Sequence, residues 1–216
     1  MEINLTNKSL ESIMSKSQRC QRNWDLSKQV TEEDLQTLKT AVTNCPSKQN
    51  RTFYKVVFIQ NRKIIEKIHK SSDSYVYCFE PRKATTNPQI LANTVAVFIR
   101  DRDPNTPPRT EREYAKGTTN GKTDKDEFKA VGIAAGYLNL TAHMLGYKTG
   151  FYGAQHGHVT LREIFGEQSY VFCMLGIGYP DETRHSRDHH LNPTLEELVD
   201  FRFHTFSKTV QVEEWK

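Results

Sequence analysis

The chain has 216 residues, of which 36% are hydrophobic and 26% are charged, and its formal net charge is +4 at pH 7. This is enough apolar material for one sizeable core, so we expect a single domain over residues 1–216. A mildly basic chain without a dense Lys/Arg stripe suits an anionic small ligand such as a phosphate, and nothing in it favours nucleic-acid binding.

The cysteine pattern and the absence of long apolar runs predict a soluble, cytoplasmic protein. Cys20, Cys45, Cys78 and Cys173 lie far apart and form no C-x-x-C pair, which argues against a disulfide scaffold and against structural zinc. No segment approaches the roughly 20 apolar residues that a membrane span needs, and residues 1–17 contain no signal-peptide core.

The first half of the chain predicts alternating helices and strands. A helix is expected over 32–43, because the Thr31 hydroxyl can cap it, Glu32 and Glu33 suit its positive end, and Pro46 ends it. β-branched and aromatic residues predict two buried strands. The elements expected after this helix are a strand at 53–59, a short helix at 63–69, a strand or an extended lead into the Pro81 turn at 75–79, and a strand at 95–99.

Residues 101–123 are rich in Pro, Thr, Gly and charged residues and show no apolar period. A polar stretch of this length is either a lid over a binding site or a solvated loop. The longest helical signal follows at 126–147, where apolar residues repeat every three or four positions and Gly146 can end the helix.

The rest of the chain completes an α+β pattern. A short strand at 149–152, a helix at 160–165, a core strand at 170–177 and a late helix opening at Pro193 are expected. This mixture predicts helices packed around an antiparallel or mixed central sheet. The tail, residues 205–216, is too long for us to expect that it hangs free of the fold.

Five short motifs occur in a fixed order across the chain: QRCQRNWD at 18–25, CPSKQN at 45–50, FEPRK at 79–83, GYLNLTAHMLGY at 136–147, and GIGYP at 176–180 followed by HSR at 185–187. Their order and spacing resemble those of the FMN-dependent nitroreductase family. The resemblance implies bound FMN, NADH or NADPH as hydride donor, and an intertwined homodimer in which the tail at 205–216 embraces the partner.

The resemblance also implies which residues bind the cofactor near the N-terminus. Gln18, Arg19, Cys20 and Arg22 fall in the first cofactor motif, where Gln18 and Cys20 replace the usual Arg and Ser and are weaker partners. Pro46, Ser47 and Asn50 match a Pro-Ser-x-x-Asn motif that reaches the flavin from the other subunit in many members. Read alone, this motif is an ordinary helix-ending turn.

The remaining implied cofactor residues lie further along the chain. Lys83 matches a lysine directed at flavin N1 and O2, with Arg82 as its substitute, while Glu80 replaces a family Asn. Gln155, His156 and Gly157 match the loop whose backbone amides approach flavin N5; a general-acid role for His156 and His158 is an alternative.

His185 and Arg187 match a basic pair that grips the phosphate, Arg187 by its planar fork and His185 by a weaker, pH-dependent charge. A metal site at His185, His189 and His190 is the alternative, but no carboxylate or Cys stands at convincing ligand spacing.

The function implied is hydride transfer from NAD(P)H through flavin N5 to a small electron acceptor, such as a nitroaromatic or quinone, by a ping-pong mechanism. No catalytic side chain is expected, because the cofactor supplies the chemistry. One alternative is an enzyme of the same fold that acts on flavin itself or on a halogenated aromatic. The other is a flavin-binding or basic interaction protein without turnover, motivated by Gln18, Cys20 and Glu80.

Overall fold

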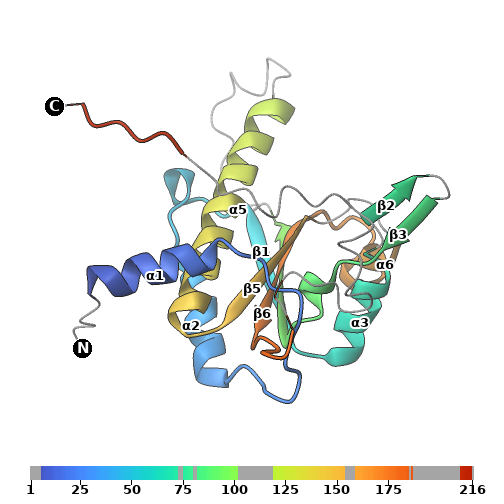
Figure 1. Cartoon of the computed structure of the whole chain (residues 1–216). Coiled ribbons are helices and arrows are strands. Elements are labelled where there is room, and N and C mark those ends of the chain that lie inside the picture. The colour runs from blue at the N-terminus through green and yellow to red at the C-terminus, as the bar shows by residue number, and fades with distance from the viewer. Residues whose placement is uncertain are drawn as a thin grey trace.

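The computed structural model describes residues 6–72, 75–79, 82–101, 119–153, 159–184, 186 and 210–215. A four-stranded antiparallel sheet lies at its centre, with helices on both faces (Figure 1). The strands follow the order β1 (Tyr54–Ile59), β4 (Thr94–Arg100), β6 (Val171–Gly178) and β5 (Lys148–Gly153). A separate hairpin pairs β2 (Tyr75–Phe79) with β3 (Arg82–Thr85). The predicted α+β class is confirmed, and the central sheet is antiparallel rather than mixed.

The helices bury the two faces of the sheet in two apolar clusters. On one face, α2 (Glu32–Thr43) and α5 (Thr119–Met144) pack against residues such as Phe98 and Leu175, and α1 (Asn7–Ser17) lies against α5. On the other face, α3 (Arg62–Lys70) and α6 (Val159–Phe165) pack against Val97 and Met174. Two short 3₁₀ turns, η1 (Lys48–Asn50) and η2 (Pro88–Ile90), complete the described elements.

Helix α2 forms where the sequence predicts it, over Glu32–Thr43. The Thr31 hydroxyl accepts a hydrogen bond from the Asp34 amide at 3.1 Å, which satisfies one of the free donors of the first turn. Leu35, Leu38 and Val42 are buried against the core, as their helical spacing indicates. Local capping and apolar periodicity agree here, so the sequence was sufficient to predict this element.

The long helix α5 covers Thr119–Met144 rather than the predicted 126–147. Its first turns are polar and extend past the body of the protein (Figure 1), so they carry no apolar period that a sequence pattern could detect. The helix ends earlier because Gly146 adopts a positive φ of 91°. Residues 119–123 therefore belong to α5 and not to the polar excursion, while 102–118 lie outside the described residues.

Three other elements differ from what the sequence analysis predicted. Strand β1 is not buried, because it lies at the edge of the sheet and only Ile59 is fully covered. Helix α1 was not predicted; Thr6 caps it, but none of its residues is buried, so its apolar pattern is weak. Strand β3 was also missed.

The helix predicted from Pro193 lies outside the described residues, as does the tail except for 210–215. Within the described part of the chain, no helix is long and apolar enough to cross a membrane.

Candidate functional site

The first cofactor motif leaves α1 as an extended segment beside the β5 edge of the sheet. The Gln21 amide donates to the Thr149 carbonyl at 2.7 Å, and Trp24 forms an antiparallel bridge with Pro180. Gln21 and Asn23 are buried, whereas Cys20 and Arg22 are half-buried. Because side chains alternate along an extended segment, Cys20 and Arg22 share its more accessible side.

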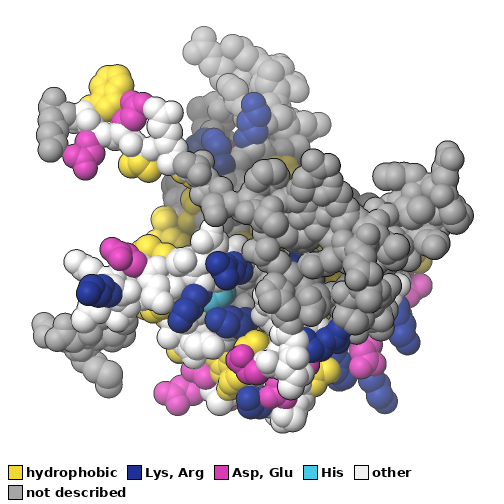
Figure 2. Space-filling model, viewed as in Figure 1, with side chains coloured by type: hydrophobic (Ala, Val, Ile, Leu, Met, Phe, Trp, Pro, Cys, Tyr) yellow, Lys and Arg dark blue, Asp and Glu magenta, His cyan; other side chains and the backbone are white. Residues whose placement is uncertain are grey.

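This segment brings the two ends of the predicted site together. The Arg22 amide donates to the Ser186 carbonyl at 3.1 Å, so Arg22 lies beside the His185-Ser186-Arg187 motif although 164 positions separate Arg22 and Ser186 in sequence. The side chains of His185 and Arg187 lie outside the described residues. Figure 2 shows Lys and Arg side chains gathered near the end of α1, and Arg19, two residues after this helix, is exposed. This charge suits a phosphate group.

The structure places both residues of this motif that differ from the family pattern, Gln18 and Cys20. Gln18 forms the C-cap of α1, and its Nε2 atom donates to the Ser15 carbonyl at 3.1 Å. The Gln18 side chain therefore caps the end of α1, a contact that the sequence pattern did not indicate. Cys20 is a half-buried free thiol.

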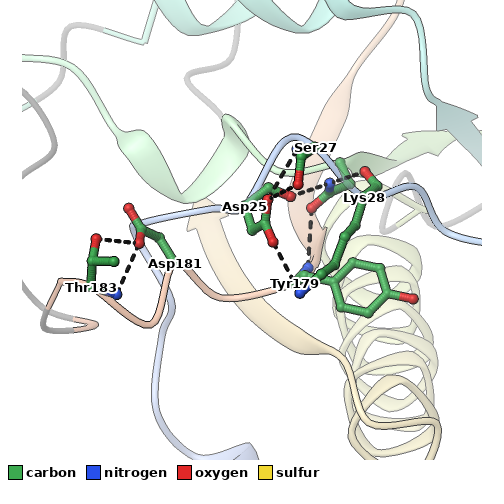
Figure 3. Close-up of polar contacts among 7 residues, drawn as sticks. Asp25, Ser27, Lys28, Tyr179, Asp181 and Thr183 are labelled. Carbon is green, nitrogen blue, oxygen red and sulfur yellow. Dashed lines mark hydrogen bonds and ion pairs between the residues drawn. The ribbon is translucent and has the colours of Figure 1, made fainter.

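A group of polar contacts fixes the end of this segment to the chain after β6 (Figure 3). The Asp25 amide donates to the Tyr179 carbonyl at 3.0 Å. The Asn93 side chain donates to the carbonyls of Asp25 and Lys28 at 2.9 and 2.7 Å and accepts from the Tyr179 amide at 3.1 Å. Nearby, the Asp181 amide donates to the Asn23 carbonyl at 3.0 Å. These contacts hold Arg22 and Ser186 in register.

Both aspartates in this group are half-buried and strongly hydrogen-bonded. The Ser27 hydroxyl, and then Lys28, lower the pKa of Asp25 below its usual value. The Thr183 hydroxyl and amide do the same to the pKa of Asp181. Both groups therefore stay ionised at neutral pH, and they stabilise turns rather than taking part in proton transfer.

The second cofactor motif lies in a groove between the end of α2 and strand β1. Ser47 and Asn50 line this groove, which has a volume of about 600 Å³. The Ser47 hydroxyl donates to the Arg51 carbonyl at 2.8 Å, and Asn50 adopts a positive φ of 54°, which Asn tolerates better than most residues. Lys48 forms an ion pair of 2.6 Å with Asp126 and so fixes the loop to α5.

The groove also contains residues that the sequence analysis missed. Lys39, Arg51 and Lys55 line it, and the described lining residues include no carboxylate. Deeper in the groove, the Tyr54 hydroxyl donates to the Val42 carbonyl at 3.1 Å and contacts the Cys45 sulfur at 3.0 Å. Burial, followed by the Cys45 contact, raises the pKa of Tyr54, so this hydroxyl stays protonated. A groove lined by Lys and Arg side chains, with uncharged Tyr54 and Cys45 side chains between them, suits an anionic or electron-rich aromatic group.

The two halves of the predicted site are far apart within one chain. The Ser47–Asn50 loop flanks edge strand β1, whereas Arg22 and Ser186 lie next to β5 and β6, on the far side of the sheet. Lys48 pairs with Asp126 of α5, while Ser17 is hydrogen-bonded to Asn139 of the same helix. Thirteen residues of helix, at a rise of about 1.5 Å each, separate these contacts by about 20 Å.

The third predicted element, Lys83, lies in the β2–β3 hairpin, where it pairs with Cys78. The base of this hairpin is closed by Ser72 and Asn87. The Asn87 amide donates to the Ser72 hydroxyl at 3.0 Å, and the Asn87 side chain donates to the Ser72 carbonyl at 2.9 Å. The structure describes no side-chain position for Lys83, and Gln155, His156 and Gly157 lie outside the described residues, between β5 and α6.

Residues 16–179 match the model of the nitroreductase family. The match covers most of the chain, so the protein belongs to the nitroreductase family and is an oxidoreductase of that family. No curated protein matches the chain at the level taken as significant.

Solved structures show the same fold at low sequence identity. A nitroreductase family protein from Clostridium novyi has a TM-score of 0.59 and 15% identity over 88% of this chain and 91% of its own. An FMN-dependent nitroreductase from Clostridium difficile has a TM-score of 0.53 and 17% identity over 88% and 95%. A protein from Desulfovibrio desulfuricans solved in complex with FMN has a TM-score of 0.59 and 14% identity over 84% and 91%.

Proposed function

We propose that this protein is an FMN-dependent oxidoreductase that takes reducing equivalents from NADH or NADPH and passes them to a small electron acceptor such as a nitroaromatic or a quinone. FMN would supply the redox chemistry, accepting hydride at N5 and releasing it to the acceptor in a ping-pong cycle. The observation that supports this proposal most directly is the 3.1 Å hydrogen bond from the Arg22 amide to the Ser186 carbonyl, which brings the first and last predicted cofactor motifs together.

The residues present fit a flavin phosphate and ring. Arg19 and Arg22, together with His185 and Arg187 in the adjacent motif, would bind and orient the phosphate and the ribityl chain. Lys83 would place a cation near the edge of the ring that becomes more negative on reduction. Cys20 shares the accessible side of its segment with Arg22 and would line the site. The backbone at 155–157 would donate to the ring.

We also propose that two copies of the chain form a homodimer that completes the site. Within one chain, Ser47 and Asn50 lie at the β1 edge of the sheet and Arg22 lies at the β5 edge, and the contacts that anchor the two segments to α5 are about 20 Å apart, so Ser47 and Asn50 would reach the cofactor of the partner. An exposed apolar stripe on α5 supports this arrangement: Ile133, Tyr137 and Met144 share one face of the helix and are 40%, 47% and 45% exposed.

Helix α1 and the tail support the same arrangement. None of the 11 residues of α1 is buried, and a helix this short is marginal without tertiary contacts, so a partner surface would stabilise it. In the tail, Val210 and Val212 alternate along an extended segment, and Trp215 is 91% exposed. The open edge of β1 could receive such a segment from the partner.

A spectroscopic experiment tests the cofactor proposal. The purified protein should be yellow, and its flavin absorbance should bleach when NADH or NADPH is added without oxygen. Steady consumption of NAD(P)H with a nitroaromatic or quinone, and parallel initial-rate lines, would support turnover by a ping-pong cycle. A colourless protein that does not bind added FMN would contradict the proposal and favour an interaction role. Yellow protein without turnover would leave the alternative of flavin binding alone.

The cationic part of the site has a matched control. Arg22→Ala should weaken FMN binding, whereas Lys63→Ala removes an exposed cation from α3, which carries no residue of the predicted site, and should not. Equal losses in the two variants would indicate a general charge effect and contradict the assignment of Arg22.

Sedimentation tests the dimer. The full chain should sediment as a dimer, and a chain that ends at Phe203 should show a weaker dimer and a lower flavin content. A stable, fully flavinated monomer would contradict the proposed interface.

A further inference from the structure

Two residues outside the predicted cofactor set hold both ends of the segment that carries Gln18, Arg19 and Cys20. The Asn139 side chain in α5 donates from Nδ2 to the Ser17 carbonyl at 3.0 Å. Its Oδ1 atom accepts from the Thr149 hydroxyl in β5 at 2.5 Å. The Thr149 carbonyl in turn accepts from the Gln21 amide at 2.7 Å. The path from residue 17 to residue 21 is thus fixed at both ends by one connected set of contacts.

We propose that Asn139 and Thr149 are positioning residues for the flavin site. This inference rests on the proposed function and extends it to residues that would not touch the cofactor. A helix and a strand are rigid supports, and both the donor and the acceptor of the Asn139 carboxamide are used, which fixes its orientation. Thr149 is 1% exposed, so its hydroxyl has no access to bulk water as a substitute partner.

We call the contacts that join Asn139 and Thr149 to Ser17 and Gln21 the clamp. The clamp orders the segment from Ser17 to Gln21 before the ligand binds. Residues 18–20 leave the end of α1, and a segment held only by helix-cap bonds would sample many conformations. With Ser17 and Gln21 fixed, the accessible side of the segment presents Cys20 and Arg22 together, and Arg22 continues into its contact with Ser186. Loss of the clamp should therefore weaken ligand binding and expose Cys20 without removing any group from the site.

A matched pair of variants at residue 149 tests the clamp. Thr149→Val keeps the shape of the side chain and its backbone carbonyl but removes the hydroxyl, whereas Thr149→Ser keeps the hydroxyl. Thr149→Val should raise the FMN dissociation constant roughly three- to tenfold, the scale of one lost hydrogen bond, and Thr149→Ser should stay near the wild-type value. Asn139→Ala should act like Thr149→Val or more strongly, because it removes both side-chain contacts.

A second readout does not depend on the cofactor. The rate at which a thiol reagent alkylates Cys20, measured by peptide mass mapping with buried Cys45 as an internal reference, should rise in Thr149→Val and not in Thr149→Ser. Asn61→Ala is the control for stability alone. It removes the N-cap of α3 on the other face of the sheet and should lower the melting temperature without changing FMN affinity or Cys20 reactivity.

The two proposals fail in different ways. A wild-type protein that binds no FMN would contradict the proposed function, and the Cys20 readout would still decide whether the clamp orders the segment. Wild-type FMN affinity and wild-type Cys20 reactivity in Thr149→Val would overturn the clamp. Equal changes in Asn61→Ala would also overturn it, since they would trace to general destabilisation.

Discussion

Gly150 in β5 offers a sharp test of how closely the candidate cofactor segment approaches the sheet. A Cβ atom at this position would lie 2.6 Å from the Gln21 carbonyl oxygen and 2.8 Å from the Gln89 Cβ. Ordinary contact begins near 3.4 Å, so the Gln21 backbone would have to move by about 0.8 Å in Gly150→Ala. That shift would stretch the bond from the Gln21 amide to the Thr149 carbonyl, now 2.7 Å, towards the limit of hydrogen bonding.

The expected cost combines overpacking, about 1–3 kcal/mol, with the weakening of one hydrogen bond, about 1 kcal/mol. Urea unfolding should therefore show a loss of about 2–4 kcal/mol, and FMN titration should show weaker binding, because Arg22 moves with Gln21. Gly153→Ala in the same strand is the control, since no described atom lies within 4 Å of its added Cβ. Wild-type stability and FMN affinity in Gly150→Ala would refute the close approach on which this reasoning depends.

Three further predictions concern single side chains. Burial lowers the pKa of His143 below 6.5. The hydrogen bond to the Asn139 carbonyl raises this pKa in part, and the charge of Lys148 lowers it further. The folded state therefore binds fewer protons than the unfolded state. Stability measured by urea unfolding should therefore fall as pH drops below 6.5, and His143→Gln should reduce that dependence; an unchanged slope would contradict it. Arg187→Ala should weaken FMN binding by about 1.5–3 kcal/mol, and unchanged affinity would reject the phosphate assignment. Cys20→Ser should bind FMN at least as tightly, because a hydroxyl is the stronger hydrogen-bond partner, and FMN should protect Cys20 from alkylation. Cys173, whose pKa burial raises to about 12, should stay unreactive throughout, and equal Cys20 labelling with and without FMN would place Cys20 outside the site.

Much of the fold could be predicted locally. The α2 cap at Thr31 and its buried Leu35 and Leu38 are local signals, and they placed the helix at its observed bounds. The apolar run at 95–99 likewise predicted a buried strand, and β4 confirms it. Prediction failed where the local sequence pattern does not report the environment. Helix α1 has no buried face, the first turns of α5 are polar in sequence, and β1 lies at the edge of the sheet.

The sequence by itself determined the order of the motifs and, through them, the family. It could not determine that Gln18 caps α1, that Gly150 lies under Gln21, or that Asn139 and Thr149 fix the path of the first motif. Nor could it place the Ser47–Asn50 loop and Arg22 at opposite edges of the sheet. Capping and periodicity depend on neighbours within a few positions, and a sequence displays those directly. The contacts of Ser17 with Asn139, of Gln21 with Thr149 and of Arg22 with Ser186 each join residues more than 100 positions apart. These residues become neighbours only when the sheet order brings their strands and helices together.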